Sequence, residues 1–112
     1  MKEKLEELIY RIVYLEKCKI IEEIAGQTKK QIDIEWKIIN IIKRIKKDKC
    51  RKILEMLKKK HQHALTQYEA LSSKGAKCDN RKLNNAFILE YALRDAIEAF
   101  EERLTTSDSM EK

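Results

Sequence analysis

Two histidines are the side chains of this sequence best suited to metal or acid–base chemistry. His61 and His63 stand two residues apart in a segment with helical periodicity. At about 100° per residue, their side chains point about 200° away from each other, so they cannot share a metal ion. No Glu-x-x-His pair of the kind that builds di-iron sites occurs in the chain. His61 falls on an apolar stripe, which predicts a histidine in the core or at an interface.

A carboxylate, Glu90, also falls within an apolar stripe, that of residues 80–104. A buried carboxylate must be paired with a partner, or it stays protonated. A catalytic acid is one interpretation of this position. We favour the other interpretation, in which Glu90 helps to specify a partner helix or extends its carboxylate to water.

Signatures of the common enzyme and cofactor sites are missing from the sequence. Gly26 and Gly75 are the only glycines, which excludes a phosphate-binding glycine loop. There is no nucleophile elbow and no pattern of a Ser/His/Asp or Cys/His site. Cys18, Cys50 and Cys78 are widely spaced without a Cys-x-x-Cys pair, so neither a zinc ribbon nor a redox dithiol is predicted. We therefore expect a protein without enzymatic activity, metal or cofactor.

The charge pattern indicates a binding surface instead. The chain has a net charge of +6, and residues 43–60 hold ten bases against two acids. The ten bases are Lys43, Arg44, Lys46, Lys47, Lys49, Arg51, Lys52, Lys58, Lys59 and Lys60. A concentrated basic segment is typical of proteins that contact the phosphate backbone of DNA or RNA. Two alternatives remain open: a solvated helix face or intramolecular partner for the acidic residues 90–112, and a surface for acidic lipid or an acidic protein.

The spacing of apolar residues predicts a chain of amphipathic helices, because these residues recur at three- and four-residue steps. The first helix spans about 3–25 and ends at Gly26, which can take the left-handed backbone conformation that follows a helix. Thr28 and Gln31 have the spacing of a capping box, so a second helix starts at about 29 and runs to at least 45.

Two further helices are predicted over about 50–72 and 80–104, separated by a polar loop at 72–79. An unbroken helix over 29–71 would be about 65 Å long, far longer than a compact domain of this size. We therefore favour a turn or a sharp kink at 46–49. The fold class is all-α: an antiparallel bundle of three or four helices, with one long kinked central helix as the alternative.

The second helix carries more apolar surface than one packing partner needs. Five isoleucines fall on one arc of this helix, and a second arc, about 120° away, holds Ile32, Trp36 and Ile39. The two arcs predict either a central position in the bundle or an interface with another chain. We expect the second arc to form the interface of a homodimer or a larger oligomer.

These expectations combine into one helical domain over residues 1–104 and a disordered polar tail over 105–112. The predicted function is that of a small non-enzymatic accessory protein that binds nucleic acid through residues 43–60. The alternative is a protein–protein interaction module, such as a small subunit or an inhibitor that docks on a larger partner. No run of about 18 apolar residues and no signal sequence is present, which predicts a cytoplasmic protein without a membrane span.

Overall fold

The computed structural model describes residues 2–73 and 80–110, with side chains for residues 5–73 and 80–105. Within these residues the chain forms four α-helices and no strand. The helices are α1 (Lys2–Ile24), α2 (Thr28–Lys43), α3 (Lys47–Ser73) and α4 (Asn80–Met110). The prediction of an all-α chain is therefore confirmed, with four helices.

The predicted helices match the observed ones in order, and their ends differ. α3 starts earlier than predicted, at Lys47, and α4 continues beyond residue 104, its predicted end. The predicted loop at 72–79 falls mostly outside the described residues.

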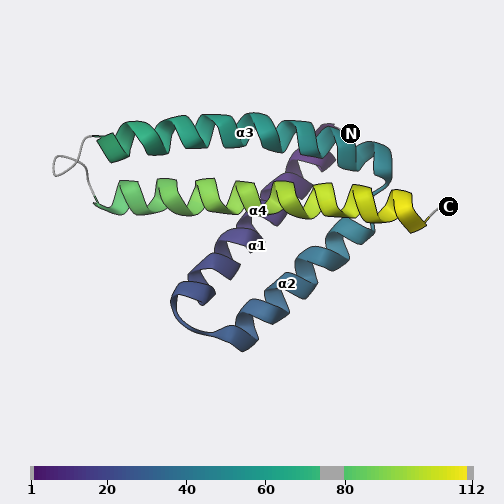
Figure 1. Cartoon of the computed structure of the whole chain (residues 1–112), viewed down its shortest axis with the longest axis horizontal. Coiled ribbons are helices and arrows are strands. Elements are labelled where there is room, and N and C mark those ends of the chain that lie inside the picture. Colours follow the sequence, from purple (N-terminus) through teal and green to yellow (C-terminus); the bar gives the residue numbers. More distant parts are fainter. Residues whose placement is uncertain (1, 74–79, 111–112) are drawn as a thin grey trace.

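The four helices form two antiparallel hairpins that cross each other (Figure 1). α3 and α4 lie side by side along most of their length, and α1 and α2 form the second pair. The hairpins pack together mainly through α1 and α4, whereas α1 barely touches α3. α2 has α1 as its main neighbour and lies on the outside of the bundle. This arrangement excludes the interpretation that the second helix is the central one.

The chain turns between α2 and α3 over Arg44, Ile45 and Lys46. The amides of Arg44 and Ile45 donate hydrogen bonds to carbonyls three residues earlier, at 3.2 and 3.1 Å, which tightens the end of α2. The side chain of Ile45 is buried and so anchors the turn in the core. The predicted break is confirmed, but it lies at 44–46 and overlaps the predicted 46–49 only at Lys46. The alternative of one long helix over 29–71 is wrong.

The connection between α1 and α2 is a Schellman motif centred on Gly26, whose φ of +77° is in the left-handed region. The amide of Gly26 donates to the carbonyl of Glu23 (3.1 Å), and the amide of Gln27 donates to the carbonyl of Glu22 (2.9 Å). The predicted helix end at Gly26 is confirmed. The predicted capping box is wrong: α2 already begins at Thr28, and Gln27 at the cap position makes no side-chain capping hydrogen bond.

The core lies where the apolar stripes of the two hairpins meet. Ile12 of α1, Leu57 of α3 and Phe100 of α4 are fully buried in one continuous cluster. α2 contributes Ile38 and Ile42, both buried, from the arc of five isoleucines. This arc is therefore the inner face of α2, and the second apolar arc of the helix does not contribute to the buried core.

Candidate functional site

The basic segment, defined as residues 43–60, covers the end of α2, the α2–α3 turn and the first half of α3. Nine of its ten basic side chains are exposed, and the tenth, Lys47, is half-buried. With ten bases against two acids, the segment carries a charge of +8, more than the +6 of the whole chain. The rest of the chain is thus slightly acidic, and the positive potential is concentrated on this segment.

Among the described side chains, the acidic residues of α4 make little ion-pair contact with this segment. One ion pair among the described side chains joins the segment to α4, between Lys58 Nζ and Glu101 Oε2 at 3.7 Å, and both side chains are exposed. Within α3, Arg51 pairs with Asp48 at 3.6 Å. Exposed pairs of this kind contribute about 0–1 kcal/mol and are screened by salt. The interpretation of the segment as an intramolecular partner of α4 therefore depends on one weak contact between described side chains.

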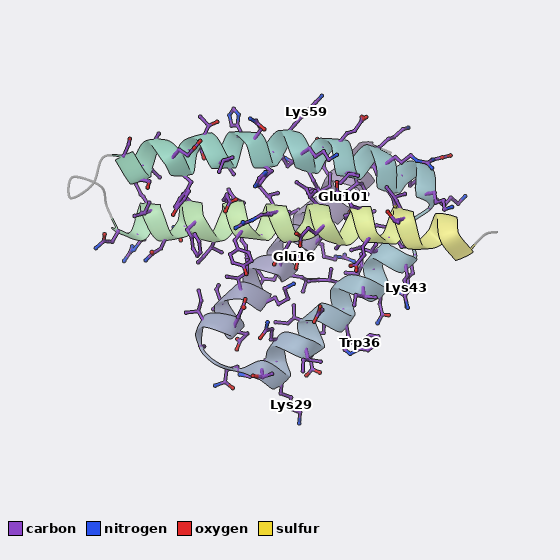
Figure 2. The ribbon with its side chains drawn as sticks, viewed as in Figure 1. Glu16, Lys29, Trp36, Lys43, Lys59 and Glu101 are labelled. Atoms are coloured by element: carbon purple, nitrogen blue, oxygen red, sulfur yellow. The ribbon has the colours of Figure 1, made fainter. Side chains whose placement is uncertain are left out.

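Eight of the ten bases fall into two groups, apart from Arg51, which pairs with Asp48, and the half-buried Lys47. Five exposed bases around the α2–α3 turn, which we call the corner cluster, are Lys43, Arg44, Lys46, Lys49 and Lys52. Lys58, Lys59 and Lys60 are consecutive on α3, so their side chains fan out by about 200° around the helix. Figure 2 shows Lys59 pointing away from α4. One ligand surface therefore cannot contact all three lysines of the second group.

The predicted oligomer interface is exposed. The side chain of Trp36 is 56% exposed and that of Ile32 is 47% exposed, while Ile39 is half-buried. Trp36 points outward from α2, away from α1 and α4 (Figure 2). Ile32, Trp36 and Ile39 thus form an apolar strip, the Trp36 strip, that is left open by the described part of the chain.

A buried ionic cluster joins α1 to α4, and sequence reasoning missed it. Glu16 is 1% exposed, and Lys19 Nζ lies 3.0 Å from Glu16 Oε1 and 3.7 Å from Asp95 Oδ2. Burial raises the pKa of Glu16 from 4.5 to about 7, although the Lys19 ammonium opposes this shift. Burial also raises the pKa of Asp95. The available signal was the four-residue spacing of Ile12, Glu16 and Ile20, which places the carboxylate on the core face of α1.

A second polar cluster lies between α3 and α4. His61 Nε2 lies 3.0 Å from Glu90 Oε1, and Arg94 Nη2 lies 3.3 Å from Glu90 Oε2. The Arg94 guanidinium also lies over the ring of Tyr91, 5.1 Å from its centroid. His61 is thus at an interface between two helices of the same chain, and Glu90 is paired within the chain. The carboxylate orients the imidazole, so the cluster holds α3 against α4.

No metal centre forms in the part of the chain that the structure describes, since no three His, Cys, Asp or Glu side chains there converge on one point. Cys50 is buried and donates from its thiol to the Ile45 carbonyl at 3.6 Å, and Cys18 is half-buried. Cys78 lies outside the described residues. None of the described helices combines the length and the apolar character needed to cross a membrane.

Comparison of this chain with protein-family models, with curated proteins and with solved structures found no match. The assignment of a function therefore depends on the charge and the shape of its surfaces.

Proposed function

We propose that this chain is a small, non-enzymatic, cytoplasmic accessory protein that binds nucleic acid by the phosphate backbone. The observation that carries the proposal is the exposure of nine of the ten bases in residues 43–60. The corner cluster supplies the main contact, because none of its five bases pairs with an acid among the described side chains. These charges are therefore available to an outside anion.

The chemistry of the corner cluster favours charge contacts over base recognition. Four of its five members are lysines, which act as flexible point charges, and Arg44 alone offers the planar fork that grips a phosphate with two hydrogen bonds. Each phosphate that a lysine neutralises releases condensed counterions, so binding weakens as salt rises. Phosphate contacts carry no sequence information directly. We therefore expect binding of DNA and RNA with little sequence preference.

The triple variant Lys43→Gln, Lys46→Gln, Lys49→Gln tests the proposal. Its affinity for a duplex DNA and for a single-stranded RNA is measured by fluorescence anisotropy over a series of salt concentrations. If all three lysines contact phosphates, the slope of log K against log salt should fall by about 2–3. The affinity at low salt should fall with it.

A matched control is available on α2. The variant Lys29→Gln, Lys30→Gln, Lys37→Gln removes the same net charge from three exposed lysines outside the corner cluster. It should keep the slope of the unmodified protein. Equal losses in the two triple variants would mean that net charge alone drives binding, and an unchanged slope in the corner variant would reject the proposal.

We also propose that the protein is a homodimer that buries the Trp36 strip. Two observations support this: the strip holds a tryptophan that is 56% exposed, and the other apolar arc of α2 is already used by the core. A twofold arrangement would cover the strip of one chain with the strip of the other. Exposed apolar patches of this type usually mark interfaces.

A protein–protein interaction module is the second candidate function. The Trp36 strip favours it, because a larger partner could cover the strip in place of a second copy. The salt dependence of binding separates the two functions. Phosphate contacts give a steep salt slope, whereas a packed apolar interface gives a shallow one.

A further inference from the structure

An open groove runs along α1, between this helix and the α3–α4 hairpin. Its first part has a volume of about 640 Å³ and is lined by Val13 of α1, Ala64 of α3 and Leu93 of α4. A second part of about 800 Å³ continues along α1 to Ile21. The two parts share three lining residues, Lys17, Gln67 and Leu89. They therefore form one continuous groove with an apolar floor.

The rim of the groove is positively charged. Four lysines line it: Lys17, Lys59, Lys60 and Lys82. Glu6 is the only acid among the described residues that line it. None of the four lysines pairs with an acid among the described side chains. The groove thus presents uncompensated positive charge beside aliphatic surface.

The α1 wall of the groove exposes large apolar side chains. Tyr10 is 76% exposed and Ile21 is 50% exposed, and both line the groove. The apolar stripe of α1 therefore continues past its contact with α4 onto the open side of the helix. A ligand seated in the groove would cover these side chains together with the floor.

We infer that this groove binds an amphipathic helix of a partner protein, with an apolar face flanked by acidic residues. α1 and α3 form the two walls of the groove, and α4 forms its floor. Because α1 barely touches α3, the space between them is where an additional helix would pack in a helical bundle. The α1 wall from Glu6 to Ile21 is about 22 Å long, which suits a helix of about 15 residues. Its apolar residues at three- and four-residue steps would contact the floor, and its carboxylates would pair with the lysines.

The lining distinguishes this ligand from a nucleic acid strand. Proteins that bind single strands in a groove stack successive bases on aromatic rings. Here the α4 floor holds Leu, Ile and Ala side chains, and Tyr10 on the α1 wall is the one Phe, Tyr or Trp side chain among the described lining residues. Lys17 and Lys82 also lie outside residues 43–60. The groove can therefore be tested independently of the proposed nucleic-acid contact.

Three synthetic peptides of about 15 residues serve as probes. The first carries leucines at three- and four-residue steps with glutamates at the flanking positions, the second has the same leucines with lysines, and the third keeps the glutamates and replaces the leucines with serines. We expect only the first to bind, at micromolar affinity, and to shift the NMR amide signals of Val13, Lys17 and Ala64. Failure of the first peptide to bind, or equal binding of the lysine peptide, would overturn the inference.

Variants locate the binding. Lys17→Glu with Lys82→Glu should weaken the first peptide by about tenfold or more, and Ile21→Ser, an exposed position, should weaken it without unfolding the protein. The control, Lys29→Glu with Lys37→Glu on α2, makes the same charge change away from the groove and should bind as the unmodified protein does. Equal losses in the control, or peptide-induced shifts confined to the corner cluster, would reject the groove as the site. Shifts of the groove signals by an RNA oligonucleotide instead of the peptide would also reject it.

Discussion

His61 Nε2 lies 3.0 Å from Glu90 Oε1, and this contact links α3 to α4 between two apolar stripes. Glu90 is 7% exposed, so its carboxylate is largely removed from water and depends on its partners. Arg94, on the exposed side, holds the other oxygen at 3.3 Å. The pair therefore fixes the register of the two longest helices, whereas Arg94 adds a contact open to solvent.

A double-mutant cycle should measure this link. Glu90→Ala and His61→Ala are each expected to lower the free energy of unfolding by about 1–3 kcal/mol, because each leaves a partly buried polar partner unsatisfied. The double variant should lose less than the sum, with a coupling energy of about 1 kcal/mol measured by urea denaturation. Arg94→Ala, which removes the exposed partner, serves as the control and should cost less than about 1 kcal/mol. Strict additivity of the two main variants would show that the contact contributes nothing.

The buried Glu16 should make the protein less stable as the pH rises from about 4.5 to 7. Its pKa is raised to about 7 in the folded chain, so the folded state binds more protons than the unfolded state in this window. The free energy of unfolding should therefore fall with rising pH, in total by on the order of 3 kcal/mol. Asp95, whose pKa is also raised by burial, acts in the same direction.

The variant Glu16→Gln removes this titrating group and keeps nearly the same shape. Its unfolding free energy, measured by circular dichroism at several pH values, should change much less between pH 4.5 and 7 than that of the unmodified protein. Glu55→Gln, at an exposed position of α3, is the matched control and should leave the pH profile in place. If the pH profile of unfolding free energy for Glu16→Gln coincides with that of the unmodified protein, Glu16 is not the group that causes the pH dependence.

Gly26→Ala should destabilise the protein through the backbone alone. A Cβ atom at this position meets no heavy atom within 4 Å, so no clash is expected. The φ of +77° nevertheless disfavours any residue with a Cβ by about 1–2 kcal/mol. Gly26→Asn should cost less, since asparagine tolerates this conformation better. If the unmodified protein and the two variants are equally stable in urea, the end of α1 does not require the left-handed conformation at residue 26.

Trp36→Glu should give a folded monomer. Because Trp36 is exposed within one chain, its replacement should disrupt association and leave the helical content unchanged. Light scattering at micromolar concentration should show a dimer for the unmodified protein and a monomer for the variant. Lys37→Gln changes the net charge by the same amount on another face of α2 and should remain dimeric. A monomeric unmodified protein would reject the homodimer.

The helices of this fold could be predicted from the sequence because the apolar residues repeat with the helical period. Gly26 could be predicted as a helix end because glycine readily adopts the left-handed backbone conformation that ends a helix. This effect depends on the local sequence alone. The two apolar arcs of α2 could also be separated in the sequence, and Trp36 lies on the arc that does not face the core.

The remaining features depend on contacts between helices, which no local pattern contains. The exact turn at Ile45 follows from the burial of this side chain among residues of other helices. Lys19, which pairs with Glu16 on α1, also contacts Asp95 of α4, and Glu90 of α4 contacts His61 of α3. The groove beside α1 exists only because α1 packs on α4 at some distance from α3, so its lysines come from three helices.

The pairing of neighbouring helices into two hairpins also bears on how the chain folds. α1 pairs with α2 and α3 pairs with α4, so most contacts join residues that are close along the sequence. Chains with such a low contact order typically fold within microseconds to milliseconds. The contact between α1 and α4 is the one extensive contact between helices that are far apart in the sequence. It forms when the α1–α2 hairpin docks on the α3–α4 hairpin. We therefore expect the hairpins to form early and the docking of α1 on α4, with Glu16 and Asp95 at this contact, to limit the folding rate.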